Sequence, residues 1–100
     1  MIPQKLRLPR SEFAARGYKI IKTPWFSLKT KENNLDYARF GVVIGTAVEK
    51  RAVKRNFWKR QARTVFAERA RAGKDYILLF LKRIKELNKN QFRAELSKVL

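Results

Sequence analysis

The chain has 100 residues, and its 25 Lys and Arg against eight Asp and Glu give a formal net charge of +17. A domain this small and this basic repels itself unless a partner supplies negative charge, and the usual partner is a nucleic acid backbone. An incidentally basic soluble domain and a protein of anionic membrane surfaces are the alternatives. The second is weakened because the basic residues are spread along the whole chain and not gathered in one amphipathic segment.

Two residue types common in enzyme and metal sites are missing from the sequence. There is no cysteine and no histidine, which excludes a disulfide framework, a thiolate metal site and the commonest general base. The carboxylates are scattered, with no pair at a spacing typical of acid/base or two-metal catalysis. We therefore predict no catalytic and no metal-ligating residue. No apolar run has the length of a signal peptide or a membrane-spanning helix, which favours a cytoplasmic location.

The first part of the chain predicts an irregular arm and one short helix. Residues 1–10 contain two prolines and several basic side chains, which is typical of an arm without regular structure. A helix should begin after Ser11, a candidate N-cap, and end at Gly17. Three strands are expected next, at residues 18–22, 25–30 and 38–45.

The second and third strands are joined by a short turn with Asn33 and Asn34 at its tip, so we expect them to pair antiparallel. In the second strand, alternation places Trp25, Ser27 and Lys29 on the face opposite to its apolar residues.

The third strand has one apolar face, and its other face is more open than a core requires. The glycines of that second face either leave it open or mark a bulge. Its residues are Arg39, Gly41, Val43 and Gly45.

The second half of the chain predicts a helix, a strand and a helix. The first helix covers about residues 49–72. The apolar run 76–81 suits a strand buried on both faces, parallel to a neighbour in the middle of the sheet. A terminal amphipathic helix covers 91–100, with Asn88 or Asn90 as its cap. The whole chain is therefore predicted to be one α+β sandwich of order α-β-β-β-α-β-α, in which the long helix is a crossover.

The long predicted helix has two distinct faces at 100° per residue. An apolar face should anchor it to the core, and it carries Trp58, Ala62, Val65 and Phe66. A basic face that could bind phosphates carries Asn56, Lys59, Arg60 and Arg63. Like-charged neighbours do not stabilise this helix by themselves, whereas the negative charge of a partner would.

Three residues of this helix have two interpretations each. Asn56 either hydrogen-bonds an RNA 2′-hydroxyl or caps neighbouring backbone. Arg55 lies nearer the core, so it either binds RNA or forms a structural salt bridge. Phe57 lies outside the core face, and it either stacks on a base or ribose or forms a small satellite cluster with Val53.

Several motifs resemble one family when they are taken in order. They are Arg39-Phe-Gly-Val-Val-Ile44, then Lys50-Arg-Ala-Val-Lys-Arg-Asn-Phe-Trp-Lys-Arg-Gln-Ala-Arg63, then Lys74-Asp-Tyr-Ile-Leu78. This pattern resembles the protein subunit of bacterial ribonuclease P over about residues 6–81. The resemblance implies a sandwich like domain 2 of ribosomal protein S5. It also implies a role in removing the 5′ leader of precursor tRNA, with Mg²⁺-dependent hydrolysis performed by the RNA subunit.

The resemblance also implies a division of the protein into two RNA surfaces. The basic helix would bind the catalytic RNA subunit of ribonuclease P, through the residues that match the family motif: Arg55, Asn56, Lys59, Arg60 and Arg63. Arg51 and Lys54 would add phosphate contacts, and Phe57 would stack on the RNA. A cleft over the sheet would bind the single-stranded leader of precursor tRNA, and Phe13 and Arg39 match residues of that cleft in the family. Trp25 and Lys29 share a strand face with Ser27 and would line the cleft if that face is the open one. Phe13 has the alternative of a core anchor. Mg²⁺ is expected on the RNA and the substrate, and the protein is expected to be a monomer within the ribonucleoprotein.

The chain departs from the pattern of that family at three places. Phe57 replaces the second arginine of its Arg-Asn-Arg motif, Ala47-Val48 replaces a pair of lysines, and Gly17 lies near a missing second aromatic of the first helix. A ribosomal protein or a ribosome-assembly factor is the alternative function, since the same charge would serve it. An autonomous nuclease is disfavoured because acid/base residues are lacking.

Overall fold

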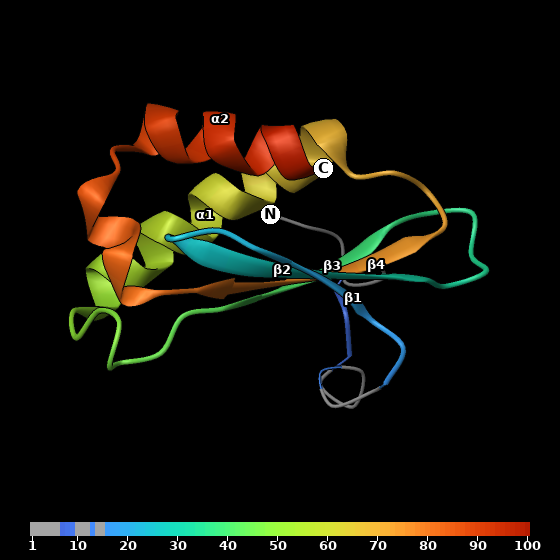
Figure 1. The fold of residues 1–100 in the computed structure, drawn as a ribbon, viewed down its shortest axis with the longest axis horizontal. Helices are drawn as coiled ribbons and strands as arrows, with labels where there is room; N and C mark the ends of the chain where they lie inside the picture. Colours follow the sequence, from blue (N-terminus) through green and yellow to red (C-terminus); the bar gives the residue numbers. More distant parts are fainter. Residues whose placement is uncertain (1–6, 10–12, 14–15) are drawn as a thin grey trace.

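Four strands form one mixed sheet, and two helices cover one of its faces in the computed structural model (Figure 1). The structure describes residues 7–9, 13 and 16–100. In chain order, the elements are β1 (Lys19–Lys22), β2 (Phe26–Glu32), β3 (Arg39–Val43), α1 (Ala52–Arg69), β4 (Lys74–Phe80), the 3₁₀ helix η3 (Lys82–Glu86) and α2 (Lys89–Val99). The predicted α+β sandwich with a crossover helix is confirmed.

Strand β4 lies inside the sheet, whose order is β1-β2-β4-β3. It pairs antiparallel with β2 and parallel with β3, so its predicted central and parallel position is confirmed. The predicted pairing of β2 with β3 is wrong, because β4 lies between them. The continuous apolar run of β4 needs cover on both sides, whereas β2 and β3 each carry polar residues on one face.

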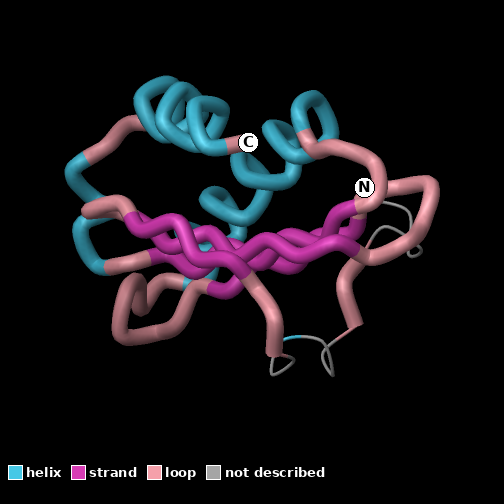
Figure 2. Tube along the Cα trace, turned by 45° about the vertical axis from the view of Figure 1, so that its right-hand side comes forward, coloured by secondary structure: helices cyan, strands magenta, loops and turns pink. Residues whose placement is uncertain are grey.

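The core lies between the sheet and the two helices, which lie on the same side of the sheet in both views (Figure 1 and Figure 2). Phe26 and Leu28 of β2 are fully buried in it, and Phe92 of α2 meets Phe26 edge-on at 5.8 Å between ring centroids. Phe40 of β3 stacks on Phe66 of α1. The opposite face of the sheet, which we call the open face, is therefore left for other contacts.

Helix α1 is shorter than predicted at both ends, but its core face is as expected. Trp58, Ala62, Val65 and Phe66 are all buried. No side chain among the described residues caps the first turn, and the chain before it is held instead by hydrogen bonds to Glu49. At the other end, the last turn stops at Arg69, and a positive φ at Gly73 directs the chain into β4.

Helix α2 begins two residues earlier than predicted because Asn88 forms a capping box with Gln91. This selects Asn88 from the two candidate caps. The 3₁₀ helix η3 was not expected; it lies between β4 and α2 in the chain and buries Ile84 completely.

The amino-terminal predictions lie largely outside the described residues. The helix expected at 11–17 cannot be compared, and of residues 1–10 the structure describes 7–9. Arg7 forms a parallel bridge with Phe40, and Leu8 is buried, so this short piece runs along the outer edge of β3. Among the described residues, no helix has the length and apolar character needed to cross a membrane.

Candidate nucleic-acid interface

The outer face of α1 presents the predicted basic side chains to solvent. Asn56 and Arg60 are exposed, and Lys59 and Arg63 are half-buried at the border of the same face. Arg51 and Lys54, at the start of the helix, are also exposed. Guanidinium groups one turn apart can each bind phosphate oxygens with two parallel hydrogen bonds. The structure thus leaves all six of these side chains at least partly accessible to solvent.

Arg55 has a structural contact, although it is not the predicted salt bridge. Its Nη1 donates to the carbonyl oxygens of Glu49 and Lys50, at 2.9 and 2.7 Å. The side chain therefore holds the segment before α1 against the first turn. Asn56 makes no hydrogen bond within the described part of the chain, so the alternative in which it caps neighbouring backbone is not observed.

Phe57 packs at the edge of the main core and not in a satellite cluster. Its ring meets Trp58 edge-on at 5.3 Å, and it packs against the core, while Val53 is 80% exposed. The helical wheel placed Phe57 outside the core face, which is wrong. Gln61, one turn later on the same side of α1, is buried and accepts a hydrogen bond from Arg93 of α2. The second helix therefore widens the buried side of α1 beyond the part that faces the sheet.

The open face of the sheet combines apolar and cationic residues in regular rows. Strand register places Lys29 of β2, Ile77 of β4 and Gly41 of β3 in one row. The next row contains Ser27, Leu79 and Val43, and Leu79 is 40% exposed. An accessible apolar surface beside ammonium groups suits the bases and the backbone of a single-stranded nucleic acid.

Gly41 makes room for Phe13 on this open face. A Cβ atom on Gly41 would lie 2.4 Å from Cζ of Phe13, so no other residue fits there unless the ring moves. The register is regular at Gly41, opposite Ile77, so the alternative of a bulge is wrong. Phe13 is thus placed on the predicted face with the tip of its ring against the sheet, and its role toward a leader stays a prediction.

Arg39 lies on the open face, but a buried carboxylate holds it. Its Nε and Nη2 donate to the two oxygens of Asp75 at 2.9 and 2.7 Å, and Asn33 donates to the same carboxylate. Burial alone would raise the pKa of Asp75, but the hydrogen bonds from Arg39 and Asn33 outweigh it, so the pKa lies below its usual value. Arg39 therefore anchors β3 to β4 and to the turn that follows β2.

Trp25 does not share the strand face of Ser27 and Lys29. It lies in the bend before β2 and packs against the core. The prediction that it lines the open face is wrong. Thr23 explains the change, because its hydroxyl accepts the backbone N–H groups of Trp25 and Phe26 and so delays the start of the strand.

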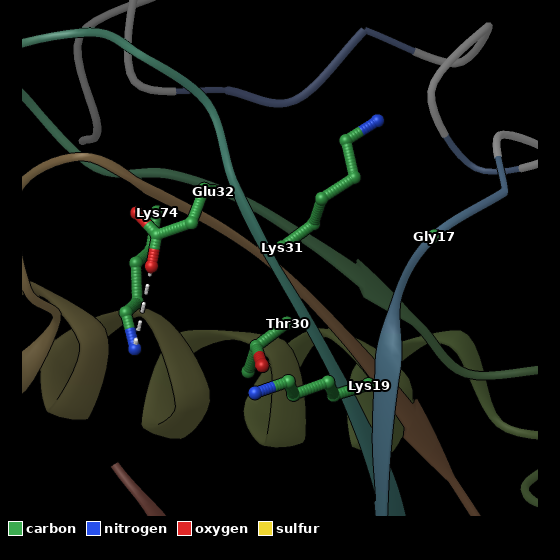
Figure 3. Close-up of a pocket in the computed structure, with 6 residues that line it drawn as sticks. All are labelled: Gly17, Lys19, Thr30, Lys31, Glu32 and Lys74. Carbon is green, nitrogen blue, oxygen red and sulfur yellow. Dashed lines mark ion pairs between the residues drawn. The ribbon is translucent and has the colours of Figure 1, made fainter.

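A shallow hollow of about 260 Å³ lies where β1 begins and β2 ends (Figure 3). Its charged residues do not converge on one point, because Lys31 extends away from Lys19 and Lys74, and Lys74 faces Glu32 at 3.9 Å. Lys31 lies instead over the ring of Tyr18. Within the described residues, no group of three carboxylates is placed to hold a metal ion.

Comparison with known proteins decides the family. The model of the ribonuclease P family matches residues 4–100. The chain belongs to this family. It is 41% identical over 56 residues to the ribonuclease P protein component of Chromobacterium violaceum, a match that covers 54% of this chain and 46% of the relative. With the corresponding protein of Pseudanabaena sp., identity is 38% over 72 residues, covering 68% and 62%.

The solved structures of ribonuclease P proteins agree with the fold. A Staphylococcus aureus RNase P protein superposes with a TM-score of 0.85 at 22% identity, covering 97% of this chain and 86% of the other. At this identity the likeness concerns the fold alone. The matches span about half to three fifths of the length of the two curated relatives named above.

Sequence reasoning missed several polar residues that organise the ribonuclease P fold here. Glu49 and Asp75 looked like scattered acids, yet both are buried and bound by arginines. Gln61 was assigned to neither face of the long helix, yet Arg93 of α2 donates a hydrogen bond to it across the helix pair. For Glu49 and Asp75 the sequence carried a weak signal. Acids are rare in this basic chain, and each of the two is adjacent to an apolar segment, which makes both candidates for buried ion pairs.

Proposed function

We propose that this chain acts as the protein component of ribonuclease P and takes part in removal of the 5′ leader from precursor tRNA. The family match over residues 4–100 is the observation that carries this proposal. The outer face of α1 would bind the RNA subunit through phosphate contacts and counterion release. If about six phosphates are neutralised, affinity should fall roughly a thousand-fold between about 50 and 200 mM salt.

The open face of the sheet is proposed to bind the single-stranded leader. Phe13 over Gly41 supplies an aromatic group, Leu79 an accessible apolar contact, and Lys29 an ammonium group for the backbone. Arg39 would act here mainly by holding the strands in place, since Asp75 binds its guanidinium.

Hydrolysis is proposed to take place in the RNA subunit, with Mg²⁺ bound by that RNA and the substrate. The role of this chain would be to add affinity for the RNA and for the leader. These contributions should matter most when Mg²⁺ is scarce, because the protein cations then replace part of the missing counter-charge.

Reconstitution tests this function directly. The protein is mixed with ribonuclease P RNA and a precursor tRNA at low Mg²⁺, and leader release is followed on a gel. We expect cleavage with both components and little with the RNA alone. No stimulation, together with co-sedimentation of the protein with ribosomes, would instead support a ribosomal role. Cleavage by the protein without RNA would contradict the assignment of chemistry to the RNA subunit.

A further inference from the structure

Glu49 is a buried carboxylate at the point where the start of α1 and η3 come together. Its side chain is 5% exposed. Oε1 accepts hydrogen bonds from the backbone N–H and from Nε of Arg51, at 3.1 and 3.0 Å. Oε2 lies 3.4 Å from Nζ of Lys85. One carboxylate therefore joins cations from two elements that are far apart in the sequence.

The two cations remain at the surface although the acid is buried. The side chains of Arg51 and Lys85 are 68% and 59% exposed. Each uses part of its donor capacity on Glu49: Arg51 binds through Nε, and a guanidinium has four further N–H groups. The remaining donors can bind an anion from outside, while Glu49 limits the conformations of both side chains.

A hollow of about 430 Å³ lies between these cations. Its lining residues are Ala47, Val48, Glu49, Lys50, Arg51 and Lys85. Three cations thus surround a space with one carboxylate, whose Oε1 accepts hydrogen bonds from Arg51 and whose Oε2 is paired with Lys85. The Arg51 side chain, by donating to Glu49, lowers the pKa of that carboxyl to about 2, so the charge that orders the cations persists at any physiological pH.

The hollow continues the basic face of α1. Arg55, one turn into the helix, binds the carbonyl oxygens of Glu49 and Lys50. The same segment therefore orders Arg51, Arg55 and Lys85 together. In Figure 1, η3 and the start of α1 lie at the same end of the sheet, so an RNA backbone that follows α1 can reach η3.

We propose that this hollow binds a phosphate group of the RNA backbone between Lys50, Arg51 and Lys85, and that Glu49 is the positioning residue that holds two of these cations in place. The inference rests on the proposed function and extends its RNA-binding surface from α1 to η3. Inorganic phosphate presents the same chemistry and is distinguished by experiment.

Replacement of Glu49 by glutamine tests the proposal, because two explanations of its role predict changes of RNA affinity in opposite directions. Glu49→Gln removes one negative charge and so raises the net charge by one. If Glu49 only neutralised neighbouring cations, this variant would bind RNA as tightly as the wild type or more tightly. Loss of the ordered cations predicts weaker binding, by roughly three- to tenfold, despite the added charge. Affinity for ribonuclease P RNA is measured by filter binding at several salt concentrations, with the unfolding temperature recorded for each variant.

Glu68→Gln is the matched control for this change. Glu68 is exposed on α1 and makes no ion pair among the described residues, and its replacement alters the net charge equally. We expect Glu68→Gln to bind RNA as tightly as the wild type or slightly more tightly. The same result for Glu49→Gln would overturn the positioning role.

Lys85→Gln tests the phosphate contact without touching the segment before α1. It should lower the slope of log affinity against log salt by about 0.7–0.9, the loss of one phosphate contact. Lys98→Gln is its control, since Lys98 is also an exposed ammonium paired with a glutamate. Equal slopes for the two variants would overturn the contact even if Glu49→Gln fails to fold.

The outcomes separate this inference from the proposed function. A wild-type protein that does not bind the RNA would contradict the function itself, and with it the inference. A wild-type protein that binds while Glu49→Gln and Lys85→Gln match their controls would overturn the inference alone. If inorganic phosphate shifts the Arg51 Nε–H resonance but neither variant changes RNA affinity, the hollow binds free phosphate and the RNA contact is wrong.

Discussion

Two buried carboxylates hold opposite ends of this molecule, and their partners differ in exposure. Asp75 binds Arg39, whose side chain is 20% exposed, so acid and base are both largely removed from water. Glu49 binds Arg51 and Lys85, which are more than half exposed. The same ion-pair chemistry therefore serves two purposes. At Asp75 the arginine is used to join strands, whereas at Glu49 the cations are ordered but left available to a ligand.

The largest expected effect is on folding, at the Asp75 end. Asp75→Asn leaves Arg39 without its counter-charge in a largely buried position, which should lower the free energy of unfolding by about 3 kcal/mol. Urea denaturation measures this loss. RNA affinity per folded molecule should stay close to that of the wild type. An RNA affinity loss larger than the stability loss would show that Arg39 also contacts the ligand and would break the comparison.

Acid should weaken both ends of the molecule, in a defined pH range. Both carboxylates have a lowered pKa, from 4.5 to about 2 for Glu49, so their stabilisation is complete above the unfolded-state pKa and is lost as pH falls through the folded-state value. We expect the free energy of unfolding to be level near neutral pH and to fall below about pH 4.5. Asp75→Asn should flatten this decline, and an unchanged profile would contradict the role of Asp75.

Phe57→Ala tests whether Phe57, which packs against the core, also contacts RNA. Phe57 packs against Trp58 at the edge of the core, so we expect the free energy of unfolding to fall by about 1–2 kcal/mol because the ring is only partly buried. RNA affinity should not change beyond what the unfolded fraction explains. A separate loss of affinity in filter binding would support stacking of Phe57 on a base or ribose.

The smallest effect is expected at Arg60, which has no ion pair within the described residues. Arg60→Gln should leave the unfolding temperature unchanged and lower the slope of log affinity against log salt by about 0.7–0.9. Arg60→Gln should lower RNA affinity less than Glu49→Gln does. The first variant removes one cation that no acid holds in place, whereas the second removes the acid that orders Arg51 and Lys85. The opposite order would argue against the importance of preorganised cations.

Local patterns in the sequence predicted much of the molecule. The apolar face of α1 follows from 3.6-residue periodicity, and Trp58, Ala62, Val65 and Phe66 are buried as expected. The apolar run of β4 predicted its central and parallel place. The motifs at residues 39–44, 50–63 and 74–78, taken in order, resemble the protein subunit of bacterial ribonuclease P, and the family match agrees.

The sequence by itself therefore determined the described strands, the two α-helices and the core face of α1, because each depends on residues close together along the chain, and its motifs in order determined the family. Tertiary structure decided the insertion of β4 between β2 and β3, the commitment of Arg39 to Asp75, and the meeting of Glu49 with Lys85. These contacts join residues that only the folded chain brings together. A buried acid needs a partner that only the fold supplies, and Phe57, which the helical wheel places outside the core face, packs against the core in the folded chain.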